Sequence, residues 1–510
     1  MTVIRHGNML YLSPDGISAA PREVVRLLHS HLSYDHRKFL YGWEARDPVT
    51  GQKRKVEVSE RRLYGVDTRG RLFTTFGFLH RIHHVLKTAG YHVLYDDLNK
   101  KYEMANSHPR PDRYKPDIGN VTYHFKFRQR QDQCLAAIAS NLCGVVHAVT
   151  GFGKMAIVAM TALLYPRAKI HVITKRLPLV NKLSEYLTRY IPGVGQFGDG
   201  VRHMGSRVTV FCAKSLHHSD FDADIVLADE AHELLADESA SYLSNYQSSR
   251  NYGLTATPEG RADGGDIRLE AIFGRTLFHL PYWEAVDLGL VVPIEVRWHD
   301  VILESNPAEG LEDVERKRAG IWFNHERNNI IAKAMSKTPQ TEQSLVLTDT
   351  IFHAAELYRR VRAQHRQRQT VLVYDKIDIA RFKSYITDDI IPSDTPRMTP
   401  ELKEQYRKMF EAGEIDAIAT PTWEVGIDPT FLQHLFVGAS FASEVKAQQI
   451  PGRASRITDK IDKQKGIIND FRDQFDRNFY RNSRTRYKIY EELRWTQLLE
   501  QGGMFLPLQW

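Results

Sequence analysis

The sequence predicts an α/β protein with two doubly wound parallel-sheet domains in tandem, a small α+β domain before them and a short helical tail after them. The first observation behind this prediction is length, because 510 residues exceed what a single hydrophobic core usually organises. The second is that short apolar runs alternate with helix-like segments from Val121 onward, which is typical of buried parallel strands joined by helices. The third is that this alternation occurs twice, so two successive sheets are expected.

The small α+β domain is predicted to occupy residues 1–107. Residues 43–66 indicate strands around a turn, and residues 77–90 indicate an amphipathic helix. A proline-punctuated and basic segment, residues 108–120, is expected to link this domain to the next one. We expect the small domain to bind DNA.

Five apolar runs predict the strands of the first sheet domain, residues 121–280, and five more predict those of the second, residues 281–470. Each run is short, apolar and followed by helix-like sequence, as buried parallel strands are. The first five are residues 144–149, 169–174, 208–212, 225–228 and 252–255, and the second five are residues 294–301, 344–348, 370–374, 417–420 and 435–438.

The last segment, residues 471–510, is rich in Arg and aromatic residues and is predicted to form the helical tail. Phe471, Phe475 and Phe479 are spaced so that they would share one helical face. Such a stripe more often packs against a neighbouring element than it stacks on nucleic-acid bases.

Composition limits the class of protein. Lys plus Arg exceeds Asp plus Glu by 69 − 62 = 7, which favours a polyanionic partner. The three cysteines form no C-x-x-C pair, so a disulfide framework or a cysteine zinc site is not expected. We find no signal-peptide pattern and no apolar run of membrane-spanning length, so a cytoplasmic protein without membrane contact is expected.

The segment Ala-Val-Thr-Gly-Phe-Gly-Lys at residues 148–154 fits a phosphate-binding loop. It follows a predicted strand and opens a predicted helix, which is the context that such a loop requires. Thr150, Gly151 and Gly153 would bring backbone N–H groups to phosphate oxygens, and the Lys154 ammonium would balance the β- and γ-phosphate charge. These residues are therefore candidates for binding a nucleoside triphosphate.

Met155 departs from the phosphate-loop pattern. It occupies the position where a Ser or Thr hydroxyl would ligate magnesium, and a thioether is a poor ligand for a hard cation. Either the metal keeps an additional water and relies on Asp229, or nucleotide turnover is weak.

Asp229 and Glu230 follow a predicted strand, so both carboxylates should lie at the edge of the sheet where open α/β proteins bind ligands. Asp229 would hold Mg²⁺ through water, and Glu230 would orient and deprotonate the attacking water. The alternative is a solvated acidic start of a helix, where Asp and Glu are common.

A pair of arginines in the second sheet domain is expected to complete the catalytic residues. Arg453 and Arg456 follow Gly452 on a predicted helix, and their spacing would place both on one side of it. There they could stabilise the charge that spreads over the transferred phosphate. Elsewhere, an arginine pair of this kind is usually a surface feature.

Taken together, these motifs identify the chain, over residues 121–470, as resembling the superfamily 2 DExH-box helicases. The resemblance implies two RecA-like domains, ATP and Mg²⁺ as cofactors, and hydrolysis coupled to movement along nucleic acid. It assigns adenine recognition to Gln131, nucleotide binding to Asp428, and coupling of hydrolysis to strand movement to three residues, His232, Thr255 and Thr257. It also assigns Gln449, Arg453 and Arg456 to the late catalytic motifs.

Within that superfamily, the order of a small first domain, a helicase core and a short tail is similar to phage recombination helicases of the UvsW type. This resemblance implies a phage enzyme that acts on forks or Holliday junctions in the host cytoplasm, in replication, recombination or repair. Lys175 and Arg176, which follow a predicted strand, are the candidates for contacting DNA.

Two alternatives remain open from the sequence. The core motifs do not distinguish DNA from RNA, so the chain could be an RNA helicase. Met155 also permits a DNA-binding or annealing factor in which the nucleotide acts as a switch with weak hydrolysis. A monomer is favoured in each case.

Overall fold

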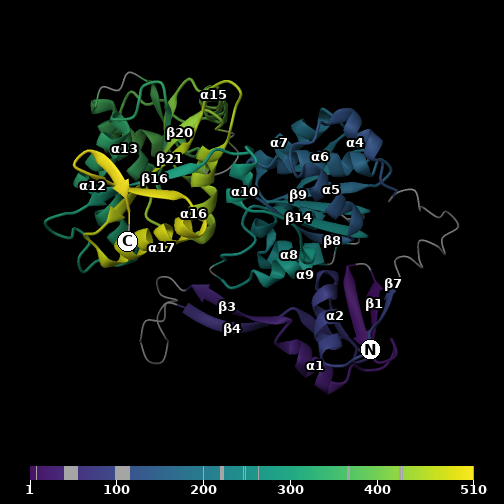
Figure 1. Cartoon of the computed structure of the whole chain (residues 1–510). Helices are drawn as coiled ribbons and strands as arrows, with labels where there is room; N and C mark the ends of the chain where they lie inside the picture. Colours follow the sequence, from purple (N-terminus) through teal and green to yellow (C-terminus); the bar gives the residue numbers. More distant parts are fainter. Residues whose placement is uncertain are drawn as a thin grey trace. The chain divides into compact units, whose positions relative to one another are not determined.

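The computed structural model describes the whole chain except for residues 7, 40–55, 98–114, 199, 219–222, 245, 247, 262, 365–367, 424–426, 428 and 509. The chain divides into two compact units (Figure 1): Met1–Val149 with Gly153–Pro281 form the first, and Thr150–Phe152 with Tyr282–Trp510 form the second. Among the described residues, no helix combines the length and the apolar character that crossing a membrane requires.

The first unit begins with a small α+β domain. Its five-stranded sheet has the order β5-β6-β2-β1-β7, and a separate hairpin is formed by β3 and β4. Leu10, Leu12 and Leu72 alternate into a core that α1 and α2 cover. The elements are β1 (Thr2–His6), β2 (Met9–Ser13), α1 (Arg22–His29), β3 (Ser33–Phe39), β4 (Val56–Arg62), β5 (Tyr64–Val66), β6 (Leu72–Thr75), α2 (Leu79–Thr88) and β7 (Leu94–Asp97).

The sequence predictions for this domain are met in part. The helix predicted over residues 77–90 is present as α2, preceded by a short 3-10 helix at Phe76–Phe78. Strands β4 and β5 lie in the second half of the stretch predicted to hold strands, and the predicted turn lies outside the described residues. Most of the predicted linker also lies outside them, and its end forms the start of α4 (Ile118–His124).

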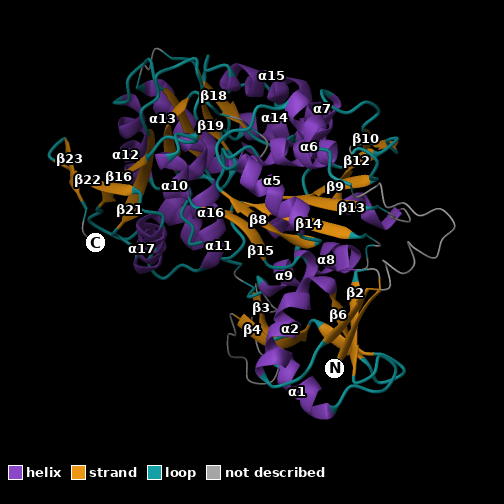
Figure 2. Ribbon diagram, turned by 45° about the vertical axis from the view of Figure 1, so that its right-hand side comes forward, coloured by secondary structure: helices purple, strands orange, loops and turns teal. Residues whose placement is uncertain are grey.

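The second part of the first unit is an eight-stranded sheet with the order β11-β10-β12-β9-β13-β14-β8-β15. All neighbours are parallel except β10 and β11. Figure 2 shows α5 and α6 on one face of the sheet and α8 and α9 on the other. The strands are β8 (Cys143–Ala148), β9 (Ile170–Thr174), β10 (Gly195–Gly198), β11 (Val201–His203), β12 (Val208–Cys212), β13 (Ile225–Asp229), β14 (Arg250–Thr255) and β15 (Thr276–Leu280), and the helices after α4 are α5 (Gln131–Ser140), α6 (Lys154–Leu164), α7 (Leu177–Thr188), α8 (Asp237–Ser244) and α9 (Ile267–Phe273).

The second unit contains another eight-stranded sheet, with the order β18-β19-β17-β20-β21-β16-β22-β23. Its neighbours are parallel except β22 and β23. The strands are β16 (Ile294–Val301), β17 (Gln343–Leu347), β18 (Thr370–Val373), β19 (Asp416–Ala419), β20 (Leu432–Val437), β21 (Gly466–Asp473), β22 (Thr496–Gln501) and β23 (Met504–Pro507), and the helices are α10 (Tyr282–Asp287), α11 (Asp313–Lys317), α12 (His325–Ser336), α13 (Ile351–Ala363), α14 (Ile379–Thr387), α15 (Pro400–Glu411), α16 (Glu444–Gln449) and α17 (Arg477–Glu492).

These two sheets are the tandem RecA-like domains that the sequence predicts. The ten predicted strands appear as β8, β9, β12, β13 and β14 in the first sheet and β16 to β20 in the second. Strands β10, β11 and β15 were not predicted, because they lack a continuous apolar run: β11 is exposed throughout, and β15 alternates between exposed and buried residues.

The prediction of a helical tail from residue 471 needs correction. Phe471 lies in β21, inside the second sheet, and therefore does not share a helical face with Phe475 and Phe479. Only α17 is helical, and β22 and β23 extend the same sheet. Asp470 and Asp473 interrupt the apolar run of β21, so its sequence lacks the pattern of a buried strand; the structure buries both of them.

The small domain docks tightly on the first RecA-like domain. Arg5, which is 1% exposed, donates to the carbonyl of Ser249 at 2.9 Å, and the Asn251 side chain donates to the Asn8 side chain at 2.7 Å. Gly77 approaches so closely that an added Cβ would lie 2.1 Å from the Glu270 carbonyl oxygen. The small domain is thus part of one body with the first sheet.

Candidate active site

The phosphate-binding loop connects the end of β8 to the start of α6. Gly151 and Gly153 have φ angles of 101° and 92°, a left-handed conformation that favours glycine. Lys154 is the first residue of α6, and its ammonium lies 3.5 Å from the Ala148 carbonyl oxygen. The loop predicted from the sequence therefore has the backbone geometry of a phosphate cradle at a helix N-terminus.

Asp229 and Glu230 lie beside this loop. Asp229 is the last residue of β13 and only 4% exposed, while Glu230 has φ 49°, a left-handed conformation that costs a non-glycine residue about 1 kcal/mol or more. This turn brings Glu230 Oε1 to 3.7 Å from Lys154 Nζ. Strain at this position is consistent with a residue held for a chemical role.

The electrostatics of the pair follow from burial. Burial raises the pKa of Asp229, the nearby charge of Glu230 raises it further, and Lys154 lowers it. The Glu230 Oε2 atom is buried without a hydrogen-bond partner. A cation or a water molecule at this position would satisfy both carboxylates, so the arrangement suits a metal ion and an attacking water.

A chain of short contacts leads from Glu230 to the end of β14. Glu230 Oε2 lies 3.6 Å from His232 Nδ1, and that nitrogen lies 2.8 Å from the Thr255 hydroxyl. The Thr255 hydroxyl also accepts the Thr257 backbone N–H at 3.0 Å. Burial lowers the pKa of His232, so its imidazole is neutral at pH 7. The structure brings together the three residues that were predicted to couple hydrolysis to movement.

Replacing Thr255 with Val tests this contact chain. The valine keeps the shape but leaves His232 and the Thr257 N–H without the hydroxyl, a cost of about 1–3 kcal/mol. We expect the rate of ATP hydrolysis to stay within about threefold of wild type and the rate of strand separation to fall at least about tenfold, because the variant weakens the coupling between the two. Parallel phosphate-release and fluorescent unwinding assays measure the two rates.

The control for this variant is Thr209→Val, which removes another buried hydroxyl, on β12, that accepts from the Gly205 N–H. It should leave the ratio of unwinding to hydrolysis unchanged. Equal losses of both activities in Thr255→Val would argue against a coupling role.

Gln131 lies next to the phosphate-binding loop. It is the first residue of α5, is 2% exposed, and its side-chain oxygen accepts the Arg128 N–H at 3.0 Å. An added Cβ on Gly153 would lie 3.0 Å from Gln131 Nε2, so the amide borders the loop. Adenine recognition by Gln131 stays a prediction.

The two candidates for contacting DNA lie just beyond β9. Lys175 is exposed, whereas Arg176 forms a two-pronged ion pair with Glu233, with Nη2 2.6 Å from Oε1. Glu233 follows the DExH motif, so Arg176 is tied to the active-site segment. A role in DNA binding stays a prediction for both residues.

Arg261 is a residue near the site that sequence reasoning missed. Its Nη1 donates to the His232 carbonyl at 3.1 Å, and its Nε donates to Asp263 at 3.0 Å. Asp266 accepts the backbone N–H groups of Gly260 and Arg261. Arg261 could have been identified from its place in the sequence, because its loop directly follows the Thr255 to Thr257 segment.

The late motifs lie in the second unit. Gln449 ends α16, and Arg453 lies in the 3-10 helix Pro451–Ser455, where its Nη1 is 3.5 Å from the Trp423 carbonyl oxygen. Arg456 follows that helix in extended conformation, so the expectation that one helix carries both arginines is wrong. The cause is Pro451 and Gly452, which favour a short 3-10 turn over a continuous α-helix. Asp428 lies outside the described residues.

The residues present fit a nucleoside triphosphate better than they fit a fully protein-ligated metal. The glycine cradle and Lys154 suit the phosphates, and Asp229 can hold Mg²⁺ through its hydration shell. Met155 supplies no oxygen, and the described residues include no cluster of three or more His, Cys, Asp or Glu side chains able to hold a metal. Magnesium is therefore expected to bind largely through water and the nucleotide.

Replacing Met155 with Thr tests this interpretation. A hydroxyl at this position could ligate magnesium, so we expect the steady-state rate of ATP hydrolysis to be preserved or raised. The measurement is phosphate release over a range of Mg²⁺ concentrations. Met155→Leu, which adds no oxygen, should match wild type; a large loss of turnover in Met155→Thr would contradict the expectation.

The two tandem RecA-like sheets and the order of the motifs along the chain resemble those of superfamily 2 helicases. Residues 124–260 match the family described as "Type III restriction enzyme, res subunit". "Putative helicase 22" of Sulfolobus islandicus filamentous virus is 24% identical over 254 residues, and the match covers 49% of this chain and 42% of that protein. The matched part is thus less than half the length of that relative.

Solved structures are similar to this chain in fold. S. cerevisiae Dbp5 bound to RNA and ADP BeF3 is 13% identical, covers 76% of this chain and 93% of its own, and has a TM-score of 0.52. A fragment of an HsdR subunit of a type I restriction enzyme from Vibrio vulnificus YJ016 is 13% identical, covers 93% of each chain and has a TM-score of 0.52. T4 UvsW is 14% identical over 98% of each chain, with a TM-score of 0.40.

Proposed function

We propose that this chain is an ATP-driven DNA translocase that unwinds or migrates branched DNA, such as forks and Holliday junctions. The observation that carries the proposal is the proximity of Glu230 to both Lys154 (3.7 Å) and His232 (3.6 Å), together with the 2.8 Å hydrogen bond between His232 and Thr255. These contacts link the residues that would bind and hydrolyse the triphosphate to the end of β14, which would move in response to hydrolysis.

The proposed chemistry assigns one role to each side chain. Lys154 neutralises the phosphates, and Glu230 orients the attacking water and accepts its proton. Asp229 holds the hydrated Mg²⁺, which when bound neutralises charge on the phosphate oxygens. Arg453 and Arg456, with Gln449, are proposed to stabilise the charge that develops on the transferred phosphate.

DNA rather than RNA is favoured by one observation: the family that matches residues 124–260 is named for a subunit of a restriction enzyme. The net charge of +7 suits a polyanion of either kind. The motifs of the core do not read the sugar, so RNA is the alternative that the experiment must exclude.

A second candidate function is favoured by Met155. Without a hydroxyl for magnesium, hydrolysis could be slow enough for ATP to act as a switch on a DNA-binding or annealing factor. This alternative predicts nucleotide binding and DNA annealing with little phosphate release.

The test combines hydrolysis and remodelling. Phosphate release is measured with a synthetic four-way junction, a fork, single-stranded DNA and RNA, and junction migration is followed on a gel with ATP and Mg²⁺. The proposal predicts the strongest stimulation by branched DNA, together with migration that needs hydrolysis. Stimulation by RNA alone would favour the RNA helicase, and nucleotide binding without turnover would favour the switch.

A further inference from the structure

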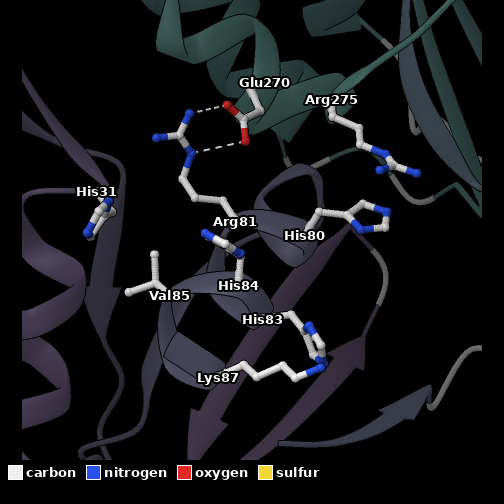
Figure 3. Close-up of a pocket in the computed structure, with 9 residues that line it drawn as sticks. All are labelled: His31, His80, Arg81, His83, His84, Val85, Lys87, Glu270 and Arg275. Atoms are coloured by element: carbon white, nitrogen blue, oxygen red, sulfur yellow. Dashed lines mark hydrogen bonds and ion pairs between the residues drawn. The ribbon is translucent and has the colours of Figure 1, made fainter. Parts of the chain in front are cut away.

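A histidine-rich, basic pocket lies where the small domain meets the first RecA-like domain. Figure 3 shows its lining residues, which come from α2 and from the segment that runs from α9 to β15. The pocket has a volume of about 610 Å³. The α2 residues His80, His83, His84 and Lys87 share one face of the helix, because their spacing follows the helical repeat. The opposite face packs into the core, so the basic face is left to line the pocket.

The pocket has an excess of positive charge. Glu270 is the one carboxylate among its described lining residues, and Arg81 neutralises it through a two-pronged ion pair, with Nε 3.0 Å from Oε1. Lys87 and Arg275 are both exposed and add two further cations. The imidazoles supply N–H donors. The lining therefore offers cations and hydrogen-bond donors with no opposing net negative charge, as a phosphate site does.

The pKa of His80 reflects the same positively charged surroundings. Burial lowers the pKa of His80, the charges of Arg275 and His83 lower it further, and Glu270 raises it. A bound anion between these groups would offset the repulsion among them. The pocket is thus electrostatically complementary to an anion.

The pocket lies away from the active-site edge of the sheet. The Arg275 carbonyl accepts the Val145 N–H at 2.9 Å, which places Arg275 near the amino end of β8. The phosphate-binding loop and the predicted DNA contacts Lys175 and Arg176 follow the carboxyl ends of β8 and β9. A ligand in the pocket is therefore distinct from the nucleotide and from a strand held at that edge.

The pocket walls are firmly connected. Gly77, just before α2, packs directly on the Glu270 backbone, and one hydrophobic core includes Leu86 of the small domain together with Cys143 and Ala271. A ligand that bridges α2 and Arg275 would meet a preformed site. Preformed sites bind more tightly, because little ordering entropy is lost on binding.

We propose that this pocket binds the phosphodiester backbone of a nucleic-acid segment other than the strand that the helicase core holds. This inference rests on the proposed function and extends it: the motor would grip one strand at the carboxyl edge of the sheet while the pocket anchors a second arm of a branched substrate. Backbone contacts of this kind position a nucleic acid without reading its sequence.

The test compares two double variants of the full chain with equal loss of charge. Lys87→Gln/Arg275→Gln removes the exposed cations of the pocket, and Arg22→Gln/Arg69→Gln removes two exposed cations of the small domain that do not line it. Binding of a fluorescent DNA fork is titrated over roughly 50 to 300 mM salt, the range in which counterion release is measurable. Single-stranded DNA and inorganic phosphate serve as comparison ligands, and unfolding midpoints verify folding.

The pocket variant should bind the fork about tenfold more weakly at roughly 0.1 M salt and should lower the salt slope by about 2, because each lost phosphate contact removes about 0.9. The control variant should match wild type, and hydrolysis stimulated by single-stranded DNA should be unchanged in both. Inorganic phosphate is also added to the wild-type protein. If low millimolar phosphate lowers the affinity of wild type for the fork to that of the pocket variant, the site binds free anions and the proposal is overturned.

The outcomes separate this inference from the proposed function. If both variants lose affinity equally, or neither does, the pocket inference is overturned while branched-DNA-stimulated hydrolysis in wild type still supports the motor. If wild type shows no nucleic-acid-stimulated hydrolysis but the pocket variant alone loses fork binding, the motor fails and the pocket inference stands.

Discussion

The Glu230→Gln variant should bind ATP with wild-type affinity and hydrolyse it about a thousandfold more slowly. The amide keeps the size and the contacts of the side chain but cannot accept the proton of the attacking water, and general-base catalysis is worth about 10²–10⁴-fold. Glu230 directly follows β13 and lies 3.7 Å from Lys154, a position from which a base would act on the water that attacks the terminal phosphate. Phosphate release and fluorescent-nucleotide binding measure the two properties.

The matched control is Glu238→Gln, an identical change at an exposed position of α8. It should leave turnover unchanged. Residual hydrolysis above about a tenth of wild type in Glu230→Gln would remove Glu230 from its assigned role, whereas a parallel loss of ATP affinity would point to damage of the whole loop.

The Arg327→Met variant should destabilise the second unit by about 3–5 kcal/mol, the usual cost of leaving a buried charge without its partner. Arg327 on α12 and Asp473 at the end of β21 are both 0% exposed and form an ion pair with Nε 2.8 Å from Oδ1. The Arg327 Nη1 also donates to the Gly438 carbonyl at 2.7 Å. Urea unfolding followed by far-UV circular dichroism measures the loss.

Two comparisons define the cause of that loss. Arg318→Met removes an arginine of the same unit whose side chain is 60% exposed, and it should change stability by less than about 0.5 kcal/mol. Adding Asp473→Asn to Arg327→Met removes the unpaired charge and should restore part of the stability. A double variant as unstable as the sum of both single variants would show that packing, not charge, carries the effect.

Much of the core could be predicted because its strands are buried on both faces. Strand β12 is buried throughout and has the bounds that its apolar run indicates, and the loop before Lys154 opens a helix as predicted. In such strands the hydrophobic pattern is local, so it can be recognised without knowledge of the neighbouring elements.

The failures share a different cause, since each depends on a partner that is distant in the chain. Strand β21 contains Asp470 and Asp473, and these carboxylates can be buried only because Arg486 and Arg327 neutralise them from α17 and α12. The docking of Asn8 on Asn251 is likewise invisible locally, because it joins residues 243 positions apart.

By itself, the sequence determined the two-sheet architecture and the residues that would handle a nucleoside triphosphate, since apolar periodicity and short glycine-rich motifs act over a few neighbouring residues. Only the tertiary structure decided that the small domain and the first sheet form one body, that the tail completes the second sheet, and that five basic α2 residues line a pocket with Arg275. These features depend on burial and on charge pairing between distant segments, which no local pattern encodes.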